Sequence, residues 1–150
     1  LPAVLINNSF VFINEAGQEI TETRDLKAAN FTNCIFDGNN NIEFFIDKAG
    51  DGGEFNYSVK NCMLKFNDTN GSFEGVAEVD FANNTNYSDV ILNGSPNFRD
   101  TQKSDFIIGE NSDAINKAIA TPFTIDFLGT DRATNPDIGA YQHITFETEE

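Results

Sequence analysis

Short runs in which apolar and polar residues alternate recur along this chain, and they predict β-strands. Residues 42–47 and residues 76–81 show the alternation most clearly, with an apolar residue at every second position. The residues expected to share one buried face are Ile42, Phe44 and Ile46 in the first strand, and Ala77, Val79 and Phe81 in the second.

A repeated pattern links three of these runs, at residues 5–12, 31–38 and 59–66. Each has an apolar residue, one variable residue, and then Asn followed by Ser or Cys. The asparagines are Asn8, Asn33 and Asn61, and their spacings are 25 and 28 residues. A near-constant period of this length is typical of a solenoid. The pattern therefore predicts an all-β fold, a right-handed parallel β-helix in which each coil stacks on the one before.

Asparagine suits a sharp corner because it tolerates the left-handed backbone region. In stacked coils the three asparagines would lie in one column, and each side-chain amide could bond to the next. After the corner, Cys34 and Phe36 should point inward, as should Cys62, Leu64 and Phe66. The first coil is ambiguous, and an antiparallel β-sandwich is the alternative fold.

Turn-forming residues separate the expected strands, at residues 37–41, 48–53, 67–72 and 82–86. No long amphipathic helix appears before residue 112. Residues 112–120 could form a short helical turn, with Ser112 as its cap.

The last third of the chain contains an ordered set of short motifs. They are Pro96 and Phe98, Asp105 and Phe106, Ser112 with Ala114 and Ile115, Asp126 with Gly129 and Arg132, and a closing Asp137, Ile138, Gly139, Ala140 and Tyr141. This set resembles the C-terminal end of right-handed parallel β-helix repeat proteins of the pectate-lyase-like superfamily, found on the surfaces of Bacteroidota. Two positions depart from that pattern: Asp113 stands where Pro is frequent, and Gln142 where Glu is common.

The resemblance implies a single β-helix domain over residues 1–150, with about three to four coils. Residues 1–89 would form the stacked coils, and residues 90–150 the terminal coil and a C-terminal cap. In that cap, Arg132 could fork onto the carboxylate of Asp126 or Asp137. Gly129 and Gly139 would allow tight bends, and the Tyr141 ring would cover the apolar edge of the last coil.

Composition narrows the list of partners. Hydrophobic residues make up 39% of the chain and fifteen residues are Phe, which indicates a folded core. The net charge of -15 would repel nucleic acid and anionic membranes. No apolar run approaches the roughly 18 residues of a membrane span, so an integral membrane protein is not expected.

The chain opens in an expected strand, without an initiating Met or a basic leader. We therefore expect a piece of a longer protein, with upstream residues or a partner chain covering the first coil. The acidic composition favours an extracellular location, and the resemblance implies the outer surface of a bacterium, with the signal sequence outside this chain.

Candidate chemistry is sparse, and no catalytic, cofactor-binding or metal-ligating residue is assigned. Cys34 and Cys62 lie 28 residues apart and are expected to be inert buried thiols, with a strained disulfide as the alternative. His143 is the single histidine, which is too little for a catalytic triad. No cofactor is expected; Ca²⁺ is the lesser alternative. Its candidate turns contain Asp47, Asp51 and Glu54, and Asp68, Asn70 and Glu74.

Three hypotheses for function follow. The preferred one is a non-catalytic extracellular or cell-surface module that acts as a scaffold, an adhesin or a carbohydrate-contacting platform, with polysaccharide or another surface protein as partner. Phe45 could stack on such a ligand, or could pack beneath a loop. The second is a polysaccharide lyase or glycoside hydrolase, although the basic residues Lys48, Lys60, Lys65 and Arg99 are scattered. The third is a subunit of a cell-envelope assembly.

Overall fold

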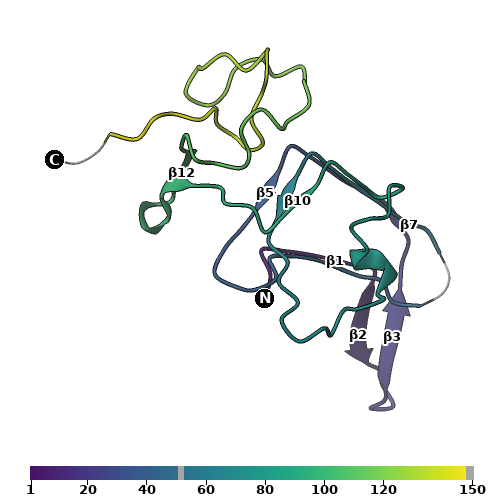
Figure 1. The fold of residues 1–150 in the computed structure, drawn as a ribbon. Helices are drawn as coiled ribbons and strands as arrows, with labels where there is room; N and C mark the ends of the chain where they lie inside the picture. The colour runs from purple at the N-terminus through teal and green to yellow at the C-terminus, as the bar shows by residue number, and fades with distance from the viewer. Residues whose placement is uncertain (51–52, 148–150) are drawn as a thin grey trace.

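The computed structural model of this chain describes residues 1–50 and 53–147, and short β-strands are its main regular elements (Figure 1). The strands are β1 (Val4–Asn7), β2 (Ser9–Ile13), β3 (Glu19–Thr23), β4 (Leu26–Thr32), β5 (Ile35–Phe36), β6 (Phe44–Asp47), β7 (Phe55–Lys60), β8 (Met63–Leu64), β9 (Tyr87–Ser88), β10 (Ile91–Leu92), β11 (Phe98–Asp100) and β12 (Asp105–Ile108). Two 3₁₀ helices accompany them, η1 (Ala77–Val79) and η2 (Thr101–Lys103). The expected all-β class is confirmed.

The described strands form five small sheets of two or three strands each. Three sheets are parallel, with the orders β1-β6, β4-β7-β9 and β10-β8-β5. The other two are antiparallel pairs, β2 with β3 and β11 with β12. The β2-β3 pair is a hairpin that projects from the rest of the molecule (Figure 1).

This arrangement contradicts the β-helix prediction. The sheets are separate and differ in orientation, and they do not join into a solenoid of three to four coils. Residues 9–23, which the repeat placed in a first coil, form the antiparallel hairpin instead. Parallel pairing of strands also ends early, because the chain beyond Leu92 enters an antiparallel hairpin and then turns, with an isolated parallel bridge between Gly109 and Ile144. The resemblance to the pectate-lyase-like superfamily was therefore misleading about architecture.

The predicted ladder of asparagine amides is also wrong, and Asn8 lies beside the end of β6, although Asn33 and Asn61 do lie in register between the pairs Thr32–Lys60 and Ile35–Met63. Asn33 and Asn61 do adopt the left-handed backbone, with φ of 56° and 48°. Their side-chain amides, however, donate to carbonyl oxygens of the C-terminal part of the chain, at Ile119 and Lys117, both at 2.8 Å. The Asn8 side chain pairs with the backbone of Ala49, accepting at 2.7 Å and donating at 3.2 Å. Each amide thus satisfies an irregular segment, not a neighbouring asparagine.

A first apolar core lies among the three parallel sheets. Its buried members are Phe44, Ile46, Tyr57, Val59, Cys62, Leu64 and Tyr87. Phe31 and Phe36 pack their rings against Phe44, at 5.5 and 5.0 Å between centroids. The inward orientation expected of Cys34, Phe36, Cys62 and Leu64 is confirmed.

A second core covers the opposite face of the β10-β8-β5 sheet. Its buried members are Met63, Ile108, Ala114 and Ile138, and Ile35 and Ile91 pack against them. The sheet is consequently buried on both faces, because successive side chains of a strand point to opposite sides. The second core attaches residues 96–147, called the loop region below, to residues 1–95, called the strand region.

Two local predictions were wrong. The expected strand at 76–81 is the 3₁₀ helix η1, within a run of turns. The hydroxyl groups of Tyr57 and Tyr87 both donate to the carbonyl of Glu78, which holds this segment against the core. The expected helical turn at 112–120 consists of turns and irregular backbone, although Ser112 Oγ does accept from the Ala114 N–H at 3.2 Å.

Candidate functional site

Two buried carboxylates organise the loop region. Asp126 Oδ1 accepts from the N–H groups of Leu128 and Thr130, both at 2.8 Å, and its Oδ2 accepts from Gln142 at 2.9 Å. Burial alone would raise the pKa of Asp126. The three N–H donors, together with the charge of Arg132, overcome burial and hold that pKa below its ordinary value.

The second carboxylate, Asp137, has no exposed surface. Its Oδ1 accepts from Asn116 N–H at 2.8 Å, and its Oδ2 lies 2.7 Å from both the backbone N and the ring Nδ1 of His143. The single histidine of the chain therefore sits against a buried acid. That acid is already bonded to backbone groups, so the pair has the geometry of a structural anchor.

Arg132 does not fork onto either carboxylate as predicted. Its guanidinium group donates to the backbone carbonyls of Gly139 at 3.0 Å and Asp137 at 2.6 Å. Gly129 and Gly139 have positive φ, 81° and 106°, as the expected tight bends require. A Cβ on Gly139 would lie 3.0 Å from Ile35 Cδ1, so this glycine also permits close contact with β5.

The bends around Asp126 leave several large apolar side chains in solvent. Phe123 is 78% exposed, Ile125 63%, Phe127 85% and Leu128 57%. They belong to residues 119–128, called the apolar loop below, which begins at Ile119, itself 44% exposed. Asp126 is the buried residue between them, so its backbone bonds turn the neighbouring side chains outward.

A groove of about 650 Å³ runs along the inner side of the apolar loop. Its lining includes Phe123, Ile125 and Phe127 from the apolar loop and Thr32 and Asn33 from the strand region. The surface is mostly apolar. The Phe127 ring lies 6.2 Å from that of Tyr141, which extends the aromatic surface toward the chain end.

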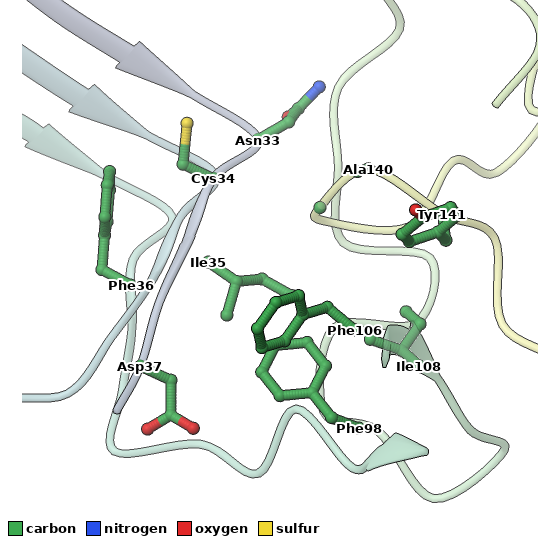
Figure 2. Close-up of a pocket in the computed structure, with 11 residues that line it drawn as sticks. Asn33, Cys34, Ile35, Phe36, Asp37, Phe98, Phe106, Ile108, Ala140 and Tyr141 are labelled. Atoms are coloured by element: carbon green, nitrogen blue, oxygen red, sulfur yellow. The ribbon is translucent and has the colours of Figure 1, made fainter. Parts of the chain in front are cut away.

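A second groove of about 590 Å³ adjoins the first, and the two share Asn33, Gly139 and Ala140. Figure 2 shows Ile35, Phe98, Phe106 and Tyr141 around it, with Asp37 at one end. The rings of Phe98 and Phe106 pack edge to face at 5.3 Å, and Phe106 is 49% exposed. Together the two grooves form one elongated apolar surface where the strand region meets the loop region.

The surface offers large apolar contacts with a few polar groups at its edges. Exposed apolar patches of this kind mark sites of interaction with other molecules. Sequence reasoning missed it because it treated the closing residues only as a cap. The signal was present in residues 123–128, where Phe, Ile, Phe and Leu occur with a single charged residue.

The structure describes only part of the candidate calcium turns. Asp51 lies outside the described residues. Asp68 accepts from the N–H groups of Ser72 and Phe73, at 2.9 and 2.8 Å, which is the role of a turn residue. Within residues 1–50 and 53–147, no group of three or more His, Cys, Asp or Glu side chains could hold a metal ion.

The other residues singled out in the sequence are the two cysteines, Phe45 and the scattered basic residues. Cys34 and Cys62 are free thiols. Phe45 packs on Phe73, 4.8 Å between centroids, as the alternative of packing beneath a loop required. Of the scattered basic residues, Arg99 pairs with Asp105 at 2.6 Å and Lys65 lies 3.8 Å from Asp37.

Comparison of the chain with protein-family models, with curated proteins and with solved structures finds no match. The proposed resemblance to pectate-lyase-like repeat proteins thus gains no support from a family model. In the part of the chain that the structure describes, no helix has the length and apolar character needed to cross a membrane.

Proposed function

We propose that this chain is a non-catalytic binding module, located outside the cell or on its outer surface, and that it docks another protein on the apolar loop. The observation that carries the proposal is the exposure of Phe123, Ile125, Phe127 and Leu128 within six consecutive residues. Leaving four large apolar side chains in water is costly, by roughly 1.5–3 kcal/mol for each compared with burial. A partner that covers them recovers this free energy.

The side chains favour a protein partner over a glycan. Phe, Ile and Leu have no hydrogen-bonding group to match the hydroxyls of a sugar, whereas they pack well in a protein interface. The groove of about 650 Å³ beside them could accept one or two apolar side chains of a partner as anchors. The adjoining groove, lined by Phe98 and Phe106, extends the contact surface.

Net charge indicates what surrounds those anchors. The chain carries 24 acidic and 9 basic side chains, so its field attracts a positively charged partner. The same field opposes association of two copies through this surface. We therefore expect an apolar segment flanked by Lys or Arg.

A pair of synthetic peptides tests this proposal. Both would carry Leu and Phe anchors; one would be flanked by Lys and the other by Glu. We expect the Lys peptide to bind with a Kd in the micromolar range, and the Glu peptide at least about 10-fold more weakly. Fluorescence anisotropy of labelled peptide measures both values.

The matched variants are Phe123→Ala with Phe127→Ala on the apolar loop, and Val11→Ala with Ile13→Ala on the β2-β3 hairpin. All four residues are exposed and apolar, so the hairpin variant reports the effect of removing apolar side chains outside the proposed site. Only the loop variant should weaken binding, by about 10-fold or more.

Three results would overturn the proposal: equal binding of the two peptides, equal effects of the two double variants, or concentration-dependent dimerisation that the loop variant abolishes. If a polysaccharide competes with the Lys peptide for the loop, the carbohydrate-contacting hypothesis would replace the protein-docking proposal. Turnover of such a polysaccharide would replace it with the enzyme hypothesis.

A further inference from the structure

The two cysteines occupy equivalent places on adjacent parallel strands. Cys34 comes directly before β5 and Cys62 directly before β8. Ile35 pairs with Met63, and the Met63 N–H donates to the Cys34 carbonyl at 2.9 Å, so Cys34 and Cys62 lie in register. Residues in register on neighbouring strands have Cα atoms about 4.8 Å apart. This lies within the range of about 4.4–6.8 Å that a disulfide spans.

Contacts of the sulfur atoms support the same geometry. The Cys34 N–H donates to Cys62 Sγ at 3.4 Å. Each thiol also donates to the carbonyl of the residue two positions earlier, Cys34 to Thr32 at 3.4 Å and Cys62 to Lys60 at 3.2 Å. The two side chains thus have matching surroundings and the same orientation, toward the first core. Figure 2 shows the Cys34 thiol pointing away from the Ile35 side chain and the groove.

The third strand of this sheet provides an internal comparison. Asn33, Asn61 and Asp89 all have left-handed backbones, and the residues that follow them are Cys34, Cys62 and Val90. Val90 packs against the same core as the two cysteines, and Ile91 after it pairs with Met63. A valine therefore fills this position, and packing alone does not require sulfur there. Two thiols on neighbouring strands add a chemistry that Val90 lacks.

We propose that Cys34 and Cys62 form a reversible dithiol–disulfide pair that is oxidised by exchange with a low-molecular-weight disulfide. The Cys34 thiolate attacks one sulfur of the small disulfide, forms a mixed disulfide and releases one small thiolate. The Cys62 thiol then attacks Cys34 Sγ, and its proton passes to the departing small thiolate. This step forms the Cys34–Cys62 bond and releases the second small thiol. Two protein thiols are oxidised and one small disulfide is reduced to two thiols.

Exposure assigns the order of attack. Cys62 is fully buried, whereas Cys34 is half-buried and lies beside β5, an edge strand of its sheet. When Cys34 ionises, the Cys62 thiol donates its one proton to Cys34 Sγ in place of the Lys60 carbonyl; this hydrogen bond lowers the pKa of the Cys34 thiol to about 7, while the same bond and burial raise the pKa of Cys62. Since the thiolate is the nucleophile, Cys34 should react first at neutral pH.

The test is incubation of the reduced, folded chain with glutathione disulfide, followed by intact-mass analysis. We expect a product lighter by two hydrogen atoms, with neither sulfur available to maleimide after unfolding. The closed loop joins residues 28 apart, so Tm should rise on the order of 10 °C and fall again on reduction. Accumulation of a stable glutathione adduct, of a disulfide-linked dimer, or of unreacted chain at equilibrium would each overturn the proposal.

Two further variants replace one cysteine each by valine, the residue found at the equivalent position 90. In Cys62→Val the reaction should stop at the glutathione adduct on Cys34. In Cys34→Val the remaining thiol, that of Cys62, is buried, so this variant should react with glutathione disulfide at least about 10-fold more slowly than Cys62→Val. Equal rates for the two variants would contradict the assigned order. The mass analysis of the unmodified chain does not depend on either variant folding.

Discussion

The strand region and the loop region are held together by different chemistry. In the strand region, aromatic and aliphatic side chains fill a core among three parallel sheets, with Phe44, Val59 and Leu64 fully buried. In the loop region, regular pairing is limited to the β11-β12 hairpin and isolated bridges, and buried carboxylates fix the backbone. Asp126 and Asp137 together accept five backbone N–H bonds there.

The contrast gives the acidic residues a second role besides solvation of the surface. A net charge of -15 suggests a solvated surface, yet several acids in the loop region act as acceptors for backbone groups. Asp113 and Asp100 do so at exposed or half-buried positions, Asp113 for Ser95 N–H and Asp100 for Gln102 N–H. In irregular backbone, N–H groups have no partner in a strand ladder, and the short side chains of aspartates provide acceptors for them. The two regions should therefore fail under different perturbations.

The largest effect should come from the core of the strand region. Phe44→Ala removes a ring that is fully buried and packed against Phe31 and Phe36, so we expect a loss of about 3–5 kcal/mol in the free energy of unfolding. Chemical denaturation measures it. Phe127→Ala is the matched control, because that ring is 85% exposed and its removal should cost less than about 0.5 kcal/mol. Similar losses for the two variants would contradict the described core.

The next effect should be confined to the loop region. Asp137→Asn replaces an acceptor of two backbone N–H groups and the His143 ring with an amide whose NH₂ cannot accept. We expect a loss of about 2–3 kcal/mol in local stability. Hydrogen exchange of the Asn116 and His143 amides should accelerate, while the Val59 amide in β7 stays protected. Uniform acceleration would show that the two regions unfold together.

The contact between the regions can be tested at Gly139. Gly139→Ala adds a Cβ where φ is 106° and Ile35 Cδ1 would be 3.0 Å away, so we expect a loss of about 1–3 kcal/mol. Gly129→Ala is the control, because its φ of 81° is also left-handed but its Cβ would meet nothing within 4 Å. The difference in Tm between the two variants separates the effect of backbone strain from that of the contact with Ile35. If Gly129→Ala is as damaging as Gly139→Ala, the contact with β5 contributes little.

The smallest effect should be a pH dependence of the loop region. The pKa of Asp126 is lower in the folded chain than in the unfolded chain, so the stabilisation is complete above the unfolded value, about 4. It is lost as the pH falls through the folded value, because protonation then removes the charged acceptor. Hydrogen exchange of the Thr130 and Gln142 amides between pH 5 and pH 3, corrected for intrinsic rates, measures it. Asp126→Asn should abolish this dependence at those two amides.

Much of the strand region could be anticipated from local patterns. The alternation over residues 42–47 located β6 and its buried Phe44 and Ile46, and the Asn-Cys pairs located left-handed corners at Asn33 and Asn61. The same alternation failed at 76–81, because the hydrogen bonds from Tyr57 and Tyr87 to Glu78 stabilise a 3₁₀ turn there. These bonds join residues 21 and 9 positions apart, outside the six-residue window in which the alternation was seen.

The loop region was far less predictable. Asp126, Arg132 and Asp137 were recognised as structural residues, but their partners were wrong in part, because Arg132 bonds to carbonyls. The apolar loop was overlooked because exposure of Phe123 and Phe127 follows from how Asp126 turns the backbone between them. Amino-acid type alone gives a phenylalanine a preference for the interior.

Local sequence patterns were enough to predict an all-β chain, the inward side chains of its central strands and the left-handed corners at Asn33 and Asn61, although not the backbone of Asn8, which is not left-handed. These properties depend on the period of two along a strand and on the conformational tolerance of asparagine and glycine, which act within a few residues. Long-range contacts, by contrast, are what arrange the strands in small separate sheets and leave an apolar surface exposed at the junction of the two regions. Those outcomes depend on contacts such as Asn33 with Ile119 and Gly139 with Ile35, where the chain meets itself about a hundred residues later.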